Sequence, residues 1–299
     1  MRQILTSVTA GTKIVYLFLL MFIGLLLAGS ILIAFSAVTG VEEGGVTIIY
    51  LSSGLQAFFA FVMPAYLVTG WSFPGAAQYL KMVDKEHAGR KIILAIMVFL
   101  LSYIPVFLLT QWNKGIELPE SMQIAEQWMR SMEDAAQETT DLLLSGEGIG
   151  RLFMNLFMIA GLAAVAEEMF FRGALQQLIQ EKFRNGHMAV WIGALIFSVV
   201  HFQFYGFFPR LLLGALLGYL FLYTQNLWIP VLMHFVNNAT VIVLAYFCRD
   251  SEWLYNIENS EITAPFAIMA LICLLLTILL FWLYKKNLRT SVQTEVDSC

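Results

Sequence analysis

The sequence predicts an all-α polytopic membrane protein with about eight transmembrane helices. Apolar residues make up 59% of the 299-residue chain and charged residues 13%, whereas soluble domains hold about 45–50% apolar residues. The mean hydropathy is +0.75. Several apolar runs also approach or reach the ~20 residues that a helix needs to cross ~30 Å of hydrocarbon. A soluble domain has no use for so many long apolar runs, so we expect the chain to cross a lipid bilayer repeatedly.

Eight apolar segments fit this prediction. They cover residues 14–38, 46–69, 91–111, 150–180, 188–204, 210–224, 227–248 and 264–284. The first is too long for the apolar core of a signal peptide, about 7–15 residues, so we expect it to remain as a spanning helix. The sixth and seventh are separated only by Gln225 and Asn226. That short connection leaves open whether the pair crosses fully or is partly re-entrant.

Basic residues in the loops predict the orientation. One set of loops holds eleven Lys and Arg residues: 1–13, 70–91, 181–187, 225–226 and 285–299. The opposite loops hold five, namely Lys114, Arg130, Arg151, Arg210 and Arg249. Because basic loops remain on the cytoplasmic side, we expect both termini in the cytoplasm, in a membrane of the bacterial inner-membrane type. The net charge of −4 argues weakly against a nucleic-acid partner.

The longest loop, residues 112–148, is expected on the outer side. Apolar residues recur at helical spacing between Met122 and Ala136, opposite acidic residues. This pattern predicts an amphipathic helix at the membrane interface. Such a helix either completes a long connection or covers a site as a lid, and the sequence leaves both open. We expect three parts in the chain: 1–149 with the first spans and this loop, 150–248 as the core, and 249–299 with the last span and a cytoplasmic tail.

Polar and ionisable side chains interrupt three of the expected spans. They are Glu167, Glu168 and Arg172 in the fourth span, His201 in the fifth, and His234 and Asn238 in the seventh. A charge at the centre of a bilayer costs roughly 2.5–3.5 kcal/mol on insertion scales, and such groups are retained where they pair or have a function. Their occurrence within one 72-residue stretch predicts an active site between the fourth, fifth and seventh spans.

Helical spacing predicts different roles for these residues. Glu168 and Arg172 are four residues apart, with the acid first, which is the favourable order for a helical ion pair. Glu167 points about 100° away from Glu168 and is therefore left free, as a general base requires. His234 and Asn238 share one helix face, where they can supply donors to a developing oxyanion.

At these residues the chain resembles the CPBP family of intramembrane proteases, which includes the type II CAAX prenyl endopeptidases and the bacteriocin-processing and Abi proteins. The family pattern is EExxxR, FxxxH and HxxxN in three spans. Here the first motif is Glu167-Glu168-xxx-Arg172. The others are Phe197-xxx-His201 and His234-xxx-Asn238, in the expected order. The resemblance covers about residues 150–248.

The resemblance implies an all-helical endopeptidase of the glutamic type with no cofactor. In such an enzyme, Glu167 and His201 activate a water molecule, His234 and Asn238 stabilise the oxyanion, and Glu168 and Arg172 support the site. A zinc-dependent version is the alternative mechanism, with Glu167, His201 and His234 as an open ligand set of the kind that zinc hydrolases use. The expected partners are the lipid bilayer and a peptide or membrane-protein substrate of unknown sequence.

Two other classes of function remain as alternatives. A non-catalytic membrane scaffold or immunity factor can use the same fold, but it does not need the complete set of Glu167, His201, His234 and Asn238. A transporter also keeps Glu and His within its spans. Transporters commonly carry internal repeats, and residues 1–149 hold no second copy of the EExxxR or HxxxN pattern. Both alternatives are therefore weaker than the protease.

Overall fold

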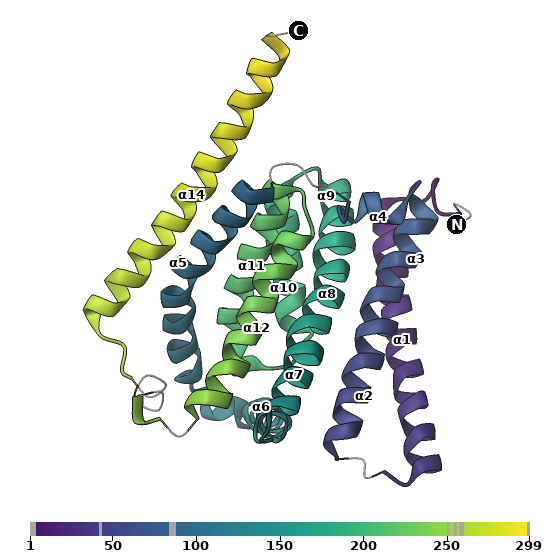
Figure 1. Cartoon of the computed structure of the whole chain (residues 1–299), viewed down its shortest axis with the longest axis vertical. Helices are drawn as coiled ribbons and strands as arrows, with labels where there is room; N and C mark the ends of the chain where they lie inside the picture. The colour runs from purple at the N-terminus through teal and green to yellow at the C-terminus, as the bar shows by residue number, and fades with distance from the viewer. Residues whose placement is uncertain are drawn as a thin grey trace.

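The computed structural model describes residues 4–41, 44–83, 88–249, 251–253, 256 and 260–297, with side chains for all of these except 88 and 287–297. These residues form helices and turns, and no strand occurs among them. Seven of the helices they form are long and apolar enough to cross a membrane. The prediction of an all-α polytopic membrane protein is confirmed (Figure 1).

The N-terminal part consists of two long helices, a short one and a third long one. These are α1 (Ala10–Thr39), then α2 (Val46–Gln56) continuing through the π-helix η1 (Ala57–Val62) into α3 (Met63–Ser72), then α4 (Ala76–Tyr79) and α5 (Ala88–Lys114). Local sequence sets the ends of α1. The Thr9 side chain accepts a hydrogen bond from the Thr12 amide, and Gly40 closes the helix at φ 68°, a left-handed conformation that favours glycine.

The second half begins with α6, which lies outside the spans, and then contains the core helices. After the 3₁₀ turn η2 (Glu120–Met122) comes α6 (Gln123–Leu144). The fourth span is continuous through α7 (Ile149–Asn155), η3 (Leu156–Leu162), α8 (Ala163–Glu168), η4 (Met169–Gln176) and α9 (Gln177–Phe183). It is followed by α10 (Gly186–Val199), η5 (Phe204–Gly206), α11 (Phe207–Thr224), α12 (Trp228–Cys248) and α14 (Ala264–Asp297).

The fifth expected span differs from the prediction. It was expected to cover residues 188–204, but α10 has 14 residues and ends at Val199, which is shorter than the ~20 residues of a full crossing. The chain then turns sharply, because Phe202 adopts a left-handed φ of 53°. His201 therefore lies on a turn just beyond a short helix and not within a spanning helix.

The helices pack around a core that joins the N-terminal and central parts. Leu17 of α1 and Val68 of α3 are fully buried in the same cluster as Phe170 and Phe171. At Gly24, α1 approaches η1 so closely that a Cβ atom would lie 1.9 Å from the carbonyl oxygen of Phe59. The three-part division of the chain stays a prediction, but these contacts show that its first two parts share a core.

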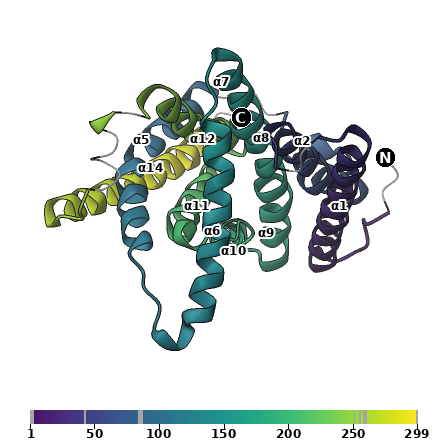
Figure 2. The ribbon, with the colours of Figure 1, turned by 90° about the horizontal axis from the view of Figure 1, so that it is seen from below.

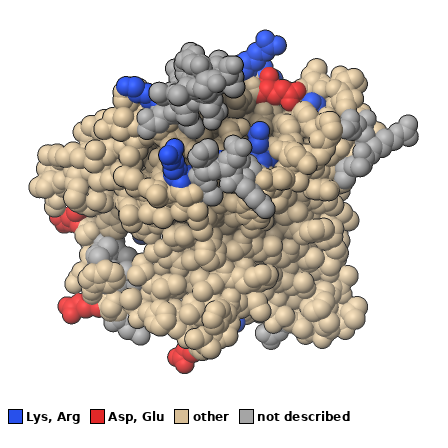
Figure 3. Space-filling model, turned by 45° about the horizontal axis from the view of Figure 1, so that its top comes forward, with Lys and Arg blue, Asp and Glu red and all other residues tan. Residues whose placement is uncertain are grey.

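Charged residues are segregated between the two ends of the bundle. The N-terminus, α4, the end of α9 and the C-terminal end of α14 lie at one end (Figure 1). In the space-filling view, Lys and Arg gather mainly at this end, whereas Asp and Glu lie mainly toward the other (Figure 3). This agrees with the grouping of loops behind the predicted orientation. Arg2 and Lys85, which contribute to that count, lie outside the described residues.

Helix α6 crosses the opposite end of the bundle (Figure 2). It is largely exposed and contacts the turn after α10: Trp128 packs on Phe204 at 5.3 Å between ring centroids, and Glu133 accepts a hydrogen bond from the Tyr205 amide at 3.2 Å. Its C-terminal end is held where the Asn155 amide group donates to the Leu143 carbonyl at 2.9 Å. The expected amphipathic helix therefore forms and is attached to the core at both ends.

Candidate active site

The fourth span changes its helical geometry at the two glutamates. Helix α8 ends at Glu168, and the π-helix η4 begins at Met169 and carries Arg172. A second π-helical segment, η3, ends at Leu162, directly before α8. π-bulges are rare and frequently occur at functional sites. π-helical segments on both sides of Glu167 and Glu168 are therefore consistent with a functional site in this part of the helix.

Glu168 belongs to a buried, ion-paired cluster in which its Oε1 atom has two partners and its Oε2 atom has none among the described residues. The Arg172 guanidinium donates to Glu168 Oε1 at 2.8 Å, so the predicted ion pair is present. The same Oε1 accepts a hydrogen bond from His234 Nδ1, also at 2.8 Å. Arg172 also donates to the Gly214 carbonyl at 3.0 Å and lies 4.6 Å above the Phe197 ring. The cluster of Glu168, Arg172 and His234 thus connects the fourth span to α10, α11 and α12.

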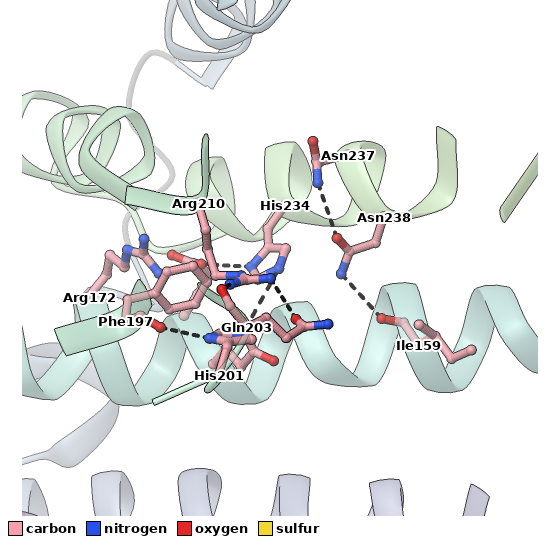
Figure 4. Close-up of polar contacts among 11 residues, drawn as sticks. Ile159, Arg172, Phe197, His201, Gln203, Arg210, His234, Asn237 and Asn238 are labelled. Atoms are coloured by element: carbon pink, nitrogen blue, oxygen red, sulfur yellow. Dashed lines mark hydrogen bonds and ion pairs between the residues drawn. The ribbon is translucent and has the colours of Figure 1, made fainter. Parts of the chain in front are cut away.

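Glu167 faces another direction, as expected from the helix geometry. Its Oε2 atom lies 3.9 Å from His234 Nε2 and 4.0 Å from His201 Nε2. That oxygen is buried and has no hydrogen-bond partner within the described part of the chain. The structure therefore brings together the three residues predicted to carry the chemistry, from α8, the turn after α10 and α12. Figure 4 shows His201 and His234 side by side in this site.

Hydrogen bonds fix which nitrogen of each histidine faces Glu167. His201 Nδ1 lies 2.7 Å from the Phe197 carbonyl, which can only accept, so Nδ1 carries the proton. His234 Nδ1 donates to the Glu168 carboxylate in the same way. In a neutral imidazole the other nitrogen is then a free acceptor. In the neutral form of each ring, Nε2 therefore faces Glu167 with its lone pair available, and in the protonated form Nε2 is a donor.

The separation of about 4 Å leaves room for a small bridging molecule. Nitrogen–oxygen distances of 3.9 and 4.0 Å are too long for direct hydrogen bonds, which lie at about 2.7–3.2 Å. Polar groups separated by more than 3.5 Å are often bridged by water. A water molecule between these atoms would contact one carboxylate and two imidazoles, which is a suitable arrangement for its deprotonation.

Asn238 lies near the site but already has partners. Its side-chain nitrogen donates to the Ile159 carbonyl at 3.3 Å, and its oxygen accepts from Asn237 at 3.2 Å (Figure 4). Ile159 belongs to the π-helix η3. One amide hydrogen of Asn238 remains for a ligand. Asn237, which the sequence reasoning missed, lines the same cavity.

These groups open onto a cavity of about 580 Å³. Its polar lining includes Glu167, His201, Gln203, Arg210, His234, Asn237 and Asn238, and most of the remaining lining is apolar. Thr140, Leu143 and Leu144 of α6 form one side of it. A volume of this size is typical of ligand sites, which lie at about 300–1,000 Å³. The candidate catalytic groups thus lie at the edge of a space that can hold several peptide residues.

Arg210 is the main cavity residue that the sequence reasoning missed. The charge count used it only as a basic residue of the outer side, whereas the structure shows it in the first turn of α11, lining the cavity. Its neighbour Gln203, on the turn after α10, was not singled out. The available signal was an Arg between the apolar fifth and sixth spans, close in sequence to His201.

The connection between α11 and α12 packs against the segment after α4. Asn226 and Leu227 in this connection are buried. The Leu227 amide donates to the Lys81 carbonyl at 3.0 Å, and the Trp228 indole donates to the Met82 carbonyl at 2.9 Å. Residues 81–82 therefore hold the start of α12, the helix that carries His234 and Asn238.

The donor set of the site is compatible with a metal ion, but the atoms are not drawn together as ligands. Two imidazole nitrogens and a carboxylate are what zinc hydrolases use, and both Nδ1 protons are held as in ligating histidines. Within the described residues, however, no group of three His, Cys, Asp or Glu side chains is close enough to hold a metal.

A comparison with protein families identifies the segment that contains these residues. Residues 149–240 match the family model described as type II CAAX prenyl endopeptidase Rce1-like. The matched segment contains all six polar residues from Glu167 to Asn238 that the motifs identified. The resemblance to a CAAX protease-like family is therefore confirmed over this part of the chain.

A related protein of Bacillus subtilis (strain 168), described as uncharacterized protein YpbD, is 32% identical over 121 residues. The aligned region covers 38% of this chain and 59% of that relative. No solved structure matches the chain.

Proposed function

We propose that this protein is an intramembrane endopeptidase that hydrolyses a peptide bond with a water molecule activated by Glu167 and His201. The observation that carries the proposal is the convergence of His201 Nε2 and His234 Nε2 on Glu167 Oε2, at 4.0 and 3.9 Å. The match of residues 149–240 to a family of endopeptidases supports the same reaction class.

In the proposed reaction, Glu167 accepts a proton from water as the water oxygen attacks the scissile carbonyl carbon. His201 holds the water through its Nε2 lone pair, because its Nδ1 proton is bound to the Phe197 carbonyl. The tetrahedral intermediate then collapses. Glu167 returns the proton to the leaving nitrogen as the carbon–nitrogen bond breaks, which gives one new carboxylate end and one new amine end. This exchange is general acid–base catalysis by one carboxyl group.

His234 and Asn238 would stabilise the oxyanion that forms in this step. Asn238 can use the amide hydrogen that is not bound to Ile159. His234 can donate from Nε2 when its ring is a cation, a form that the Glu168 carboxylate at 2.8 Å from Nδ1 stabilises. Donors that are fixed before the reaction are effective in such a role, because no reorganisation is needed as charge develops.

The zinc-dependent version remains the second candidate, because the same three side chains form a plausible donor set. In that case Glu167, His201 and His234 would hold the ion, and the ion would supply Lewis acidity. The apolar cavity and the positions of Glu168 and Arg172 would serve either mechanism. The effect of a chelator on cleavage distinguishes the two mechanisms.

We further propose that both termini face the cytoplasm of a bacterial inner membrane, since the basic residues gather at the end of the bundle that carries them. The substrate would then be a peptide, a leader segment or a membrane-protein terminus that reaches the cavity. Reporter fusions to either terminus, scored for cytoplasmic or outer location, test the orientation.

The activity is tested by incubating the purified protein in detergent with a library of quenched peptides. We expect cleavage by the wild type, no cleavage by Glu167→Ala, and no effect of a strong chelator. Loss of cleavage on chelation with recovery on adding zinc would replace the glutamic mechanism by the metal-dependent one. Equal cleavage by wild type and Glu167→Ala would contradict the proposed site, and no cleavage of any peptide would favour a non-catalytic scaffold.

A further inference from the structure

Arg210 is a cation in the wall of the cavity that the proposed reaction leaves without a role. It lines the same space as Glu167 and His201, and Figure 4 shows it beside His201 and Gln203. Its guanidinium donates to two atoms of Gln203, the side-chain oxygen at 2.6 Å and the main-chain carbonyl at 3.3 Å. Both acceptors are neutral. Gln203 thus orients the guanidinium without neutralising its charge.

The pairing of Arg210 differs from that of Arg172 and Arg130. Arg172 and Arg130 each contact a glutamate four residues earlier, at 2.8 and 2.6 Å. For Arg210, no carboxylate lies within ion-pair distance in the described part of the chain. The charges of Glu133 and Glu167 act on it from farther away, one from α6 and one from the candidate active site. Its remaining N–H donors are available for another acceptor.

A partly buried cation of this kind is costly unless an anion comes to it. The guanidinium presents five donors in a planar fork that matches a carboxylate in a two-point contact. The surrounding wall is apolar, with Leu213, Leu216 and Leu217 on the same helix. An extended apolar peptide that ends in, or contains, a carboxylate is complementary to such a surface.

We propose that Arg210, oriented by Gln203, binds a carboxylate of the peptide substrate and so determines which peptide bond reaches Glu167. This inference rests on the proposed function and adds a recognition site to it. The carboxylate is either the free C-terminus of the substrate or an acidic side chain. In both cases, a fixed anchor at Arg210 sets a fixed register for the peptide relative to the water held by Glu167 and His201.

The inference is tested with three peptides that share one sequence. One ends in a free carboxylate, one ends in an amide, and one ends in an amide but has a glutamate in place of one apolar residue near its end. The wild type is expected to show a KM about 10- to 100-fold lower for a carboxylate-bearing peptide than for the neutral one, the range for hydrogen bonds to a charged group. Which carboxylate peptide is favoured identifies the source of the anion.

Two variants separate recognition from folding. Arg210→Gln should reduce the carboxylate preference to about one. Gln203→Glu should have the same effect in a folded protein, because it gives Arg210 a carboxylate of its own. Lys114→Gln is the matched control, since it removes an exposed cation outside the cavity and should keep the preference of the wild type. An equal KM for all peptides with the wild type, or an unchanged preference in both variants, would overturn the inference.

Binding of the same labelled peptides to Glu167→Gln, followed by fluorescence anisotropy, keeps this test distinct from the test of activity. A preference for carboxylate peptides that depends on Arg210 supports the recognition site even where no peptide is cleaved. Cleavage by the wild type without such a preference supports the protease but rejects the role of Arg210.

Discussion

Glu167 and Glu168 are consecutive in the chain but lie in different surroundings. The Glu168 side chain is completely buried, and its Oε1 atom is bound by both Arg172 and His234. The Glu167 side chain is 17% exposed, faces the cavity, and has two imidazole nitrogens about 4 Å from its Oε2 atom. The two side chains point about 100° apart around one helix. This difference in direction places Glu168 in a structural cluster and Glu167 at the proposed site of reaction.

The residues around the two glutamates differ in the same way. The paired side comprises Glu168, Arg172 and His234, and the cavity side comprises the residues that face the cavity with Glu167. Around Glu168, the Arg172 guanidinium pairs with the carboxylate, and Glu168 Oε1 accepts two hydrogen bonds of 2.8 Å, so these groups hold four helical segments together, although Glu168 Oε2 has no partner among the described residues. On the cavity side, His201, Gln203 and Arg210 keep unused donors or lone pairs. A buried polar group that is only partly satisfied costs stability, and a protein retains it where a ligand completes the arrangement. We therefore expect substitutions on the two sides to change different measured quantities.

The largest effect is expected for His201→Ala on the cavity side. Loss of a positioned acid–base group typically lowers kcat by about 10²- to 10⁴-fold, while the folded state should keep its thermal stability. His187→Ala is the control, because His187 is exposed at the start of α10, hydrogen-bonded to Tyr219 and remote from the cavity. The measurements are kcat for peptide cleavage and the unfolding temperature of both variants. A fall in unfolding temperature that accounts for the lost activity would argue against a catalytic role.

On the paired side, Glu168→Gln and Arg172→Met should each destabilise the protein. Removing one partner of a buried ion pair costs about 3–5 kcal/mol, because the other charge is left uncompensated. The double variant should cost less than the sum of the two, since it leaves no isolated charge. The measurement is unfolding in detergent of all three variants. Additive losses would mean that the pair is not coupled as its 2.8 Å contact implies.

Asn238→Ala tests a residue that faces the cavity and also links two helices through its hydrogen bond to the Ile159 carbonyl. As an oxyanion donor it should lower kcat by about 10²-fold or more. As a mere link to the Ile159 carbonyl it should lower only stability. Asn237→Ala is the matched control for a neighbouring amide on the same cavity wall. Comparable losses of kcat in both variants would show that the oxyanion is held by the pair of amides and not by Asn238 alone.

The smallest effect is expected far from the site, at the contact of α1 with η1. Gly24→Ala places a Cβ atom 1.9 Å from the Phe59 carbonyl oxygen, so the helices must separate, at about 1–3 kcal/mol for overpacking. Gly29→Ala in the same helix has no atom within 4 Å of its Cβ and should be neutral or slightly stabilising. Unfolding temperatures of the two variants give the comparison. Equal unfolding temperatures for the two variants would contradict the close contact of α1 with η1 at Gly24.

Much of the local structure follows from sequence alone. Apolar run lengths predict seven of the spanning helices to within a few residues. The four-residue spacing of Glu168 and Arg172 predicts their ion pair, and the rotation between adjacent helix positions predicts that Glu167 stays free. These features depend on contacts within one helix, whose geometry is nearly constant, and they persist even though η4 is π-helical.

Features that depend on contacts between helices could not be predicted in the same way. The bond from His234 to Glu168 joins residues 66 positions apart. The end of α10 at Val199 depends on the left-handed turn at Phe202, a residue with no intrinsic preference for that conformation. Arg210 was not recognised as a site residue, because its position in the cavity depends on how α11 packs against α10 and on Gln203.

The most direct test of the account is a side-by-side measurement of kcat and unfolding temperature for Glu167→Gln and Glu168→Gln with one cleavable peptide. The account predicts that Glu167→Gln loses cleavage by a factor of about 10³ or more and unfolds at the wild-type temperature. Glu168→Gln should unfold at a clearly lower temperature, and its residual cleavage should follow the folded fraction. The reverse pattern, or equal loss of both quantities in the two variants, would contradict the division between a reacting and a structural glutamate.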